Sequence, residues 1–437
     1  MRRPDSRSGL GHIVVGSLGI HVRHPIWLRK FGAPGAESLA VLFTIESLAR
    51  AVLATVIPLQ ALDLLGDAQS VSVLFFAVSC VGLCGSLTVP WMVRRTARRW
   101  IYSAGAVLLA AAGGLLALEG TFGQVAGMMA RVIGTVAVTI CINLYIMDNI
   151  PRRELTRMEP KRMFYSAGAW TIGPVLGVFL RNEVAEWAPY VVSTATSCTM
   201  LGYFWFLRMT EKPVFSGPAD RAPGPLANVK RFAAQPRLLL AWLAAIGRNV
   251  WWAIFFIYGP IFAVQSGLGE MVGGIIVSAG SGFLFLIPVW GWCTRRFGLR
   301  RMLLIGFSVS GISTLLAAAL AGAPWATVVM LMVAAFAMIA VDAVGNVPFM
   351  LSVRPRERAE MTSVYNTYRD VAEMAPPGII SLLLRVFELP VVFVTGGIVV
   401  LAVAGLSRRM HPRLGLPRDP APIKSPTLLP GQQVVSG

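Results

Sequence analysis

The sequence predicts an all-α membrane protein with twelve transmembrane helices, and three observations support this fold class. The 437 residues are 55% hydrophobic and only 14% charged, whereas soluble domains average about 25% charged residues. The apolar residues form stretches of about 20, the length that a helix needs to cross a bilayer. The basic residues concentrate on one side of these stretches. The composition therefore excludes a water-soluble multidomain enzyme and a disordered chain.

Twelve stretches of the sequence are long and apolar enough to span a membrane. In chain order they are residues 38–64, 69–92, 100–119, 121–148, 162–181, 186–207, 237–264, 270–291, 300–321, 324–351, 360–384 and 388–407. The longest internal connection is rich in Pro and Gly and separates six spans from six. We therefore expect a cytoplasmic N-terminal segment (1–37), a six-helix half (38–207), a cytoplasmic central loop (208–236), a second six-helix half (237–407) and a cytoplasmic tail (408–437).

The distribution of Lys and Arg predicts the orientation of the spans. Thirty-three of the 39 basic residues lie in the two termini and in the connections that follow even-numbered spans, while only Arg181 and Arg385 lie on the opposite side. Because basic loops stay in the cytoplasm, we expect a multi-pass protein of the plasma or inner membrane with both termini cytoplasmic. The net charge of +18 is thus a topology signal. It does not indicate nucleic-acid binding.

The two halves of the chain resemble each other at a shift of about 200 residues. The connection after the second span reads Pro90-Trp-Met-Val-Arg94-Arg95-Thr-Ala97-Arg98-Arg99, and the connection after the eighth reads Gly291-Trp-Cys-Thr-Arg295-Arg296-Phe-Gly298-Leu-Arg300-Arg301. A second match is a pair of prolines at nearly the same spacing in each half. Pro151 is followed by Pro174 in the first half, and Pro355 is followed by Pro377 in the second. Two pseudo-symmetric six-helix halves around a midplane cavity are the architecture of secondary transporters.

On these motifs the chain resembles the major facilitator superfamily over nearly its full length. The family motif after the second span is G-x-x-x-D-[RK]-x-G-[RK]-[RK]. The copy after the eighth span matches it at Gly291, Arg296, Gly298 and Arg300. Where the family motif has its Asp, this sequence has Arg295 after the eighth span and Arg94 after the second. Both copies therefore lack the acidic residue. The resemblance implies that these matched residues, with Arg94 and Arg95, act in the conformational change.

The fifth span resembles the drug/proton antiporter branch of that superfamily. It reads Gly168-Ala-Trp-Thr-Ile-Gly173-Pro174-Val-Leu-Gly177, which is similar to the branch's G-P-x-x-G signature. Glycines let helices approach closely, and a proline lets a helix bend. Arg131-Val-Ile-Gly134 in the fourth span is similar to that branch's Arg-containing motif, with the spacing one residue short. The alternative interpretation is that these small residues only pack the spans.

Eight ionisable residues lie inside the spans, where a charge is costly and is a functional candidate by default. They are Glu46, Arg50, Arg131, Arg248, Asp342, Arg369, Asp370 and Glu373. Their charges balance, which predicts ion pairs that face an aqueous cavity. Glu46 and Arg50 are one helical turn apart, and we expect them to pair. In the major facilitator superfamily, spans one, four, seven and ten line the cavity. The resemblance therefore implies that the cavity is lined by Glu46, Arg131, Arg248 and Asp342.

A proton carrier is expected among the intramembrane carboxylates. A carboxyl group in a low-dielectric cavity holds its proton more tightly, and a nearby guanidinium favours its release. Glu46 is the first candidate and Asp342 the second, followed by Asp370 and Glu373 in a secondary charge network with Arg369. The alternative is that these groups are buried ion pairs that fix the register of the helices. Asp148, at the end of the fourth span, is expected to act in gating or to anchor a loop.

The predicted function is proton-coupled export of small amphipathic compounds by alternating access. The residues expected to line the substrate pocket are Asn249, Trp251, Trp252 and Asn346, with further aromatic and methionine candidates at Met128, Met129, Trp170, Phe255, Phe256 and Tyr258. The alternative function is a proton-coupled symporter of a small organic anion that Arg131 and Arg248 would bind. The partners are then a small molecule, protons and the lipid bilayer. We expect a monomer with no enzymatic activity, no cofactor, no metal ion and no nucleic acid.

Overall fold

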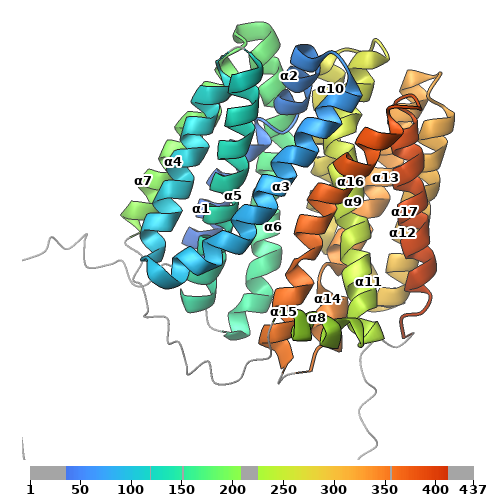
Figure 1. Ribbon diagram of the computed structural model, residues 1–437. Helices are drawn as coiled ribbons and strands as arrows, with labels where there is room; N and C mark the ends of the chain where they lie inside the picture. Colours follow the sequence, from blue (N-terminus) through green and yellow to red (C-terminus); the bar gives the residue numbers. More distant parts are fainter. Residues whose placement is uncertain (1–35, 119, 150–151, 208–224, 355–356, 412–437) are drawn as a thin grey trace, which may run out of the picture.

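The computed structural model describes residues 36–118, 120–149, 152–207, 225–354 and 357–411, and all regular structure in these ranges is helical. Figure 1 shows one bundle, with the helices before residue 208 on one side and those after residue 224 on the other. We refer to these as the N-terminal group and the C-terminal group. The expected N-terminal segment up to residue 35, residues 208–224 of the central loop and the tail from residue 412 lie outside the described residues.

The N-terminal group contains seven α-helices within the described residues. They are α1 (Ala36–Ala51), α2 (Val56–Leu65), α3 (Ala68–Arg95), α4 (Arg98–Leu116), α5 (Thr121–Asn149), α6 (Arg152–Phe179) and α7 (Ala188–Phe206), with the π-helical turn η2 (Leu180–Val184) after α6. The expected first span is therefore divided between α1 and α2.

The C-terminal group begins with a short helix and contains three further divided spans in its described part. The elements are α8 (Pro225–Ala233), α9 (Pro236–Gln265), α10 (Glu270–Gly282), the 3-10 turn η3 (Phe283–Leu286), α11 (Ile287–Phe297), α12 (Leu299–Ala319), α13 (Pro324–Val344), α14 (Val347–Ser352), α15 (Arg358–Asn366), α16 (Tyr368–Leu383) and α17 (Val391–Ser407). Span eight is divided at η3, span ten between α13 and α14, and span eleven between α15 and α16.

The expected helical membrane fold is confirmed. Nine helical segments of the described residues are long and apolar enough to cross a membrane, from Glu37–Leu65 to Pro324–Ser352, and they coincide with nine of the twelve expected spans. The other three expected spans correspond to α7, to α15 with α16, and to α17, which is apolar but shorter. All three lie within the bundle in Figure 1.

The two ends of the bundle differ in their connections. At one end, which we call the α2/α10 end, the turns are tight. Gly66 ends α2 at a φ of 81°, and the Asp67 carboxylate then accepts a hydrogen bond from the Ser70 backbone at the start of α3. Gly267 and Gly269 have positive φ between α9 and α10. We call the opposite end, where α8 lies in Figure 1, the α8 end.

The last part of the expected central loop is a helix, which corrects the prediction of a loop over 208–236. Pro225 begins α8, and Phe232 of α8 is buried in a cluster with Phe349 and Tyr365. Arg231 of α8 pairs with Glu357 at 2.9 Å. An apolar contact and an ion pair therefore attach this helix to the C-terminal group, and the short amphipathic run was not distinct enough in the sequence to predict it.

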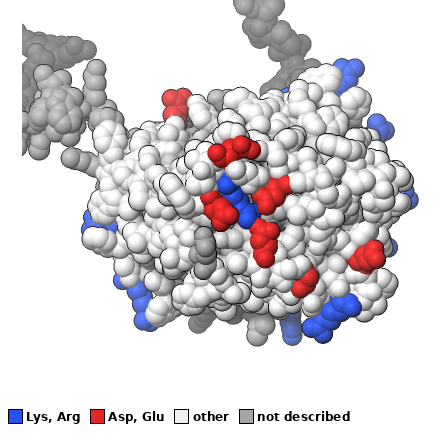
Figure 2. Space-filling view, turned by 90° about the horizontal axis from the view of Figure 1, so that it is seen from above, with Lys and Arg blue, Asp and Glu red and all other residues white. Residues whose placement is uncertain are grey.

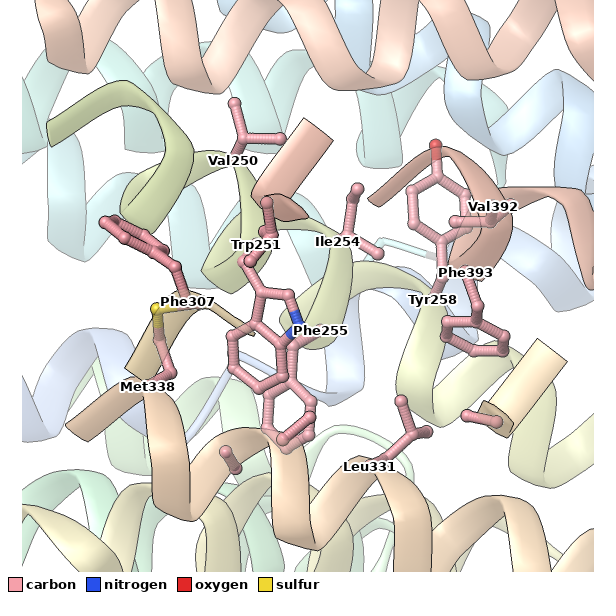
Figure 3. Close-up of a cluster of buried hydrophobic side chains, with 14 of the residues drawn as sticks. Val250, Trp251, Ile254, Phe255, Tyr258, Phe307, Leu331, Met338, Val392 and Phe393 are labelled. Atoms are coloured by element: carbon pink, nitrogen blue, oxygen red, sulfur yellow. The ribbon is translucent and has the colours of Figure 1, made fainter. Parts of the chain in front are cut away.

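One face of α9 forms the core of the C-terminal group. Trp251, Ile254, Phe255 and Tyr258 recur at intervals of three or four residues, so they lie on one side of the helix. In Figure 3 these side chains point towards Phe307, Leu331, Met338 and Phe393, which come from α12, α13 and α17. The indole of Trp251 is stacked on Phe255 with ring centroids 5.0 Å apart.

The interruption of the first span exposes backbone carbonyl groups that other helices bind. Between α1 and α2 the Ala54 N–H donates to Ala51, one residue closer than in a regular α-helix, which leaves the Arg50 carbonyl available. The Arg131 guanidinium of α5 donates to this oxygen at 3.0 Å. The Ser193 hydroxyl of α7 donates to the Ala49 carbonyl at 2.8 Å. The interruption is therefore held by three neighbouring helices, including α6.

The glycines of the fifth span explain how α6 approaches this interruption. A Cβ atom on Gly177 would lie 1.9 Å from the Val52 carbonyl oxygen, and one on Gly173 would lie 2.5 Å from the Ala51 Cβ. A Cβ on Gly168, in the same helix, would meet no atom within 4 Å. The expected close helix approach therefore occurs at Gly173 and Gly177, next to Pro174, and its partner is the interrupted first span.

Gly177→Ala is expected to destabilise the protein, because the added methyl group would collide with a backbone oxygen that cannot move independently. Overpacking of this kind costs about 1–3 kcal/mol. Thermal unfolding of the purified protein in detergent measures the effect. Gly168→Ala is the matched control, and equal melting temperatures for the two variants would contradict the packing argument.

Candidate functional site

The first charged cluster lies in the N-terminal group at the end of α1. Glu46 is 1% exposed, and the expected pair with Arg50 is present. Arg50 Nε lies 2.7 Å from Glu46 Oε1, and Arg50 Nη2 lies 3.3 Å from Oε2. The Arg50 side chain is 23% exposed, so this guanidinium is not sealed by its neighbours. Arg131 joins the cluster through the Arg50 carbonyl, and no carboxylate of the described residues lies within ion-pair distance of Arg131.

The second charged cluster lies in the C-terminal group between α9 and α13. Arg248 Nε lies 3.4 Å from Asp342 Oδ1, and the Trp252 indole N–H donates to Asp342 Oδ2 at 2.9 Å. Both charged side chains remain partly exposed. Each group of helices therefore holds a carboxylate of the expected set, Glu46 or Asp342, beside an arginine of its own group.

The helix that carries Asp342 ends only two residues later, at Val344, so the expected span over 324–351 is present but interrupted. Gly345 has a φ of +52°, a conformation that side chains with a Cβ rarely adopt. Asn346 therefore does not share a helix face with Asp342. Its side-chain oxygen instead accepts a hydrogen bond from the Tyr365 hydroxyl at 3.0 Å. The Gly345 and Pro348 pair in the sequence was the available signal for this interruption.

Three aromatic side chains connect the two clusters, and we call Trp170, Phe256 and Trp252 the aromatic bridge. The Arg50 guanidinium carbon lies 5.7 Å from the centre of the Trp170 ring. Trp170 of α6 lies 5.3 Å from Phe256 of α9, and Phe256 lies 5.5 Å from Trp252. Trp252 is the residue that donates to Asp342. The bridge thus runs from the N-terminal cluster to the C-terminal one across the boundary between the two groups.

One of the expected pocket residues, Trp251, lies in the core of the C-terminal group. Trp251 is 1% exposed and donates its indole N–H to Thr314 at 2.8 Å, inside the core shown in Figure 3. Asn249 donates to the Ala245 carbonyl of its own helix. Adjacent residues of a helix point in directions about 100° apart, so Trp252 reaches Asp342 while Trp251 turns into the core. Trp251 is therefore removed from the candidate site.

The acidic residues of α16 lie against α3 of the other group. The Ser79 hydroxyl of α3 donates to the Glu373 backbone oxygen at 3.1 Å. The Glu373 side chain itself is exposed. The Arg369 Nε donates to the Tyr368 hydroxyl at 3.2 Å. Glu373 therefore lies at a contact between the two groups, and the expected charge network with Arg369 stays a prediction.

A third charged cluster, which the sequence did not predict, closes the α2/α10 end. Arg181 of η2 pairs with Asp63 of α2 and lies 3.6 Å from Glu270 Oε1 at the start of α10. Figure 2, which views this end, shows a basic group enclosed by acidic side chains near the middle of the face. We call these three residues the Arg181 network. It connects the two groups of helices, because Asp63 and Arg181 belong to one and Glu270 to the other.

Two hydrogen bonds below the Arg181 network also join the groups. The Ser72 and Tyr258 hydroxyl groups lie 2.7 Å apart in a buried contact between α3 and α9. The Val175 backbone N–H donates to Ser278 Oγ at 2.9 Å between α6 and α10. The two groups are therefore in direct polar contact over the part of the bundle next to the α2/α10 end.

The repeated motif residues lie at the α8 end. Gly298 joins α11 to α12 with a φ of +88°, which explains its glycine, whereas its counterpart Ala97 has a φ of −57°. Gly291 lies next to the Arg295 guanidinium, and Arg300 is half-buried. The guanidinium groups of Arg95 and Arg296 lie over the rings of Trp91 and Trp292. The side chains of Arg94 and Asp148 lie outside the described residues.

Within the part of the chain that the structure describes, no three His, Cys, Asp or Glu side chains are grouped closely enough to hold a metal ion. The polar chemistry of the candidate site is that of guanidinium, carboxylate and indole groups. The carboxylates can bind and release protons, whereas the guanidinium and indole groups act as hydrogen-bond donors.

Comparison with known proteins identifies the architecture. The family model described as Major Facilitator Superfamily matches residues 39–374 and 275–433. A POT family transporter solved in complex with 5-aminolevulinic acid has a TM-score of 0.69 at 14% identity, covering 85% of this chain and 95% of that one. A peptide transporter POT in complex with sulfate has a TM-score of 0.68 at 12% identity, with coverage of 89% and 97%. The nucleoside transporter NupG has a TM-score of 0.62 at 13% identity, with coverage of 85% and 98%. No curated protein matches the sequence.

Glu270→Gln is expected to loosen the contact between the two groups at the α2/α10 end, because it removes the charge that one group presents to Arg181. A partly exposed ion pair contributes up to about 1 kcal/mol, so the separated state should gain about fivefold in population. Double electron–electron resonance measures the distance distribution between spin labels attached at Glu186→Cys and Glu388→Cys. The labelled protein lacks the native cysteines.

Glu183→Gln is the control, because Glu183 is an exposed acidic residue of η2 at the same end. If the distance distribution of the Glu270→Gln variant is as narrow as that of the Glu183→Gln variant, the Arg181 network does not hold the groups together.

Proposed function

The chain belongs to the major facilitator superfamily of secondary transporters, and from this premise we propose that it exports small amphipathic compounds in exchange for protons. The observation that carries the proposal is the pair of charged clusters, one in each group of helices, joined by the aromatic bridge. A charge inside a membrane is retained where it serves a solute or ion pathway. A site shared by both groups changes its access when the groups move relative to each other.

The aromatic bridge supports an amphipathic substrate. Trp170, Phe256 and Trp252 are each half-buried and offer ring faces to a flat apolar group. Arg50 and Asp342 lie at the two ends of the bridge and supply one positive and one negative charge for the polar part of the substrate. The direction of transport is proposed from the glycine and proline motif of α6, which resembles the antiporter branch.

Glu46 is the proposed proton carrier. As a carboxylate it pairs with Arg50 through both oxygens. A proton on Glu46 cancels the charge that holds this pair, and the released guanidinium then has the Trp170 ring as its nearest aromatic partner. Proton binding at Glu46 is thereby linked to the position of the Arg50 guanidinium next to the proposed substrate site. Asp342 has the same relation to Arg248 and Trp252 and is the second candidate.

Alternating access is proposed to occur between the α8 end and the α2/α10 end. The basic residues gather at the α8 end, so we assign it, with both termini, to the cytoplasm. The Arg181 network then closes the outer side. The closely packed Gly173 and Gly177 next to the interrupted first span form the proposed pivot.

Glu46→Gln is expected to abolish substrate-stimulated proton flux, because the amide neither binds nor releases a proton in the working pH range. The assay uses proteoliposomes with an internal pH-sensitive dye and a panel of amphipathic cations. The double variant Glu46→Gln with Arg50→Gln separates a proton carrier from a structural partner. If Glu46 only neutralises Arg50, the double variant recovers proton flux, and the assignment of Glu46 is rejected.

A second function is favoured by one observation, the Arg131 guanidinium that has a neutral carbonyl as its hydrogen-bond acceptor. Such a group is available to bind a carboxylate or phosphate, which supports proton-coupled uptake of a small organic anion. Uptake of labelled organic anions into proteoliposomes, driven by a proton gradient and reduced at least about tenfold by Arg131→Gln, would establish this function. Anion uptake that does not respond to Arg131→Gln would eliminate it.

A further inference from the structure

Two exposed Trp–Arg pairs occupy equivalent positions in the two groups of helices. The Arg95 guanidinium carbon lies 4.1 Å from the centre of the Trp91 ring in the last turn of α3. The Arg296 guanidinium carbon lies 5.5 Å from the centre of the Trp292 ring in the last turns of α11. Trp91 is 53% exposed and Trp292 is 52% exposed. In each case the tryptophan precedes the arginine by one helical turn.

Among the residues that the structure describes, no carboxylate pairs with the arginine of either pair. No Asp or Glu occurs between Asp67 and Glu119 or between Glu270 and Asp342. Neither Arg95 nor Arg296 forms an ion pair with the described residues, and both side chains are exposed. Further arginines follow in the next turn of each motif copy. Each pair therefore presents an exposed guanidinium group that has no ion-pair partner among the described residues.

The depth of the two pairs relative to the membrane indicates which kind of ligand they bind. Both lie at the α8 end of a membrane-spanning segment, within one or two turns of its last residue. This is the depth of lipid headgroups, where tryptophan is enriched. The ring supports the flat side of the guanidinium, and the N–H groups at its edge remain free for a phosphate oxygen pair. A zwitterionic lipid neutralises its own phosphate, whereas an acidic lipid presents an unpaired negative charge.

We propose that Trp91–Arg95 and Trp292–Arg296 are two equivalent binding sites for the headgroup phosphate of acidic phospholipids. The lipid phosphate supplies the negative charge that no described residue places beside Arg95 or Arg296. The proposal concerns surfaces outside the candidate transport site and is independent of the substrate.

Native mass spectrometry of the delipidated full-length protein, titrated with phosphatidylglycerol, tests the proposal. The wild type is expected to retain two tightly bound lipids, and Arg95→Gln and Arg296→Gln one each, with the affinity of the altered site about fivefold to tenfold lower. Arg95→Lys keeps the charge but loses the planar contact, so it should bind more weakly than the wild type. Trp91→Leu should lower the affinity of the same site.

Arg408→Gln and Arg409→Gln are the matched controls, because these exposed arginines follow α17 at the same end without a tryptophan partner. The proposal is overturned if these controls lower lipid binding as much as Arg95→Gln does, or if phosphatidylcholine binds as tightly as phosphatidylglycerol. Full displacement of the lipid by millimolar inorganic phosphate would also overturn it, since the sites would then bind free phosphate. Melting temperatures equal to the wild type confirm that each variant is folded.

Discussion

The cost of placing a charge or a free backbone group inside a membrane is the constraint on which this structure depends. A charged side chain at the centre of a helix costs about 3 kcal/mol even after it adapts to its surroundings, and an unpaired carbonyl is also costly. Glu46 and Asp342 each have an arginine within the membrane interior. Arg131 in turn binds the carbonyl that the interrupted first span exposes. The charges and the interruption therefore stabilise each other.

The helix interruptions lie where the functional groups gather. The first span breaks next to Arg50, and the tenth breaks next to Asp342, at Gly345. A broken helix can alter its direction at one point without disturbing its two halves. The packing that surrounds the first break has almost no spare room, because Gly177 lies against the Val52 carbonyl. Small movements of α6 relative to α1 must therefore be transmitted to the cluster that contains Glu46 and Arg50.

The contacts between the two groups of helices combine apolar packing with specific polar contacts at several levels of the bundle. The Arg181 network connects the groups at the α2/α10 end, the Ser72–Tyr258 and Val175–Ser278 hydrogen bonds lie below it, and the aromatic bridge joins the charged clusters. Hydrogen bonds and ion pairs can exchange for contacts with water when the groups separate. At the α2/α10 end, Leu62 and Val71 of the N-terminal group also share a buried apolar cluster with Phe262 of α9, and separation of the groups would expose this surface.

The sequence by itself determined the properties that depend on neighbouring residues. The length of the apolar stretches predicted nine segments of the structure with every end but one within three residues, and the spacing of Glu46 and Arg50 predicted their ion pair. Only the tertiary structure decided which distant residues meet. Trp251 and Trp252 are adjacent and chemically identical, yet one lies in the core and the other binds Asp342. Arg181 carried no pattern that pointed to Asp63 and Glu270, because contacts between helices depend on how whole faces pack and not on the spacing within one segment.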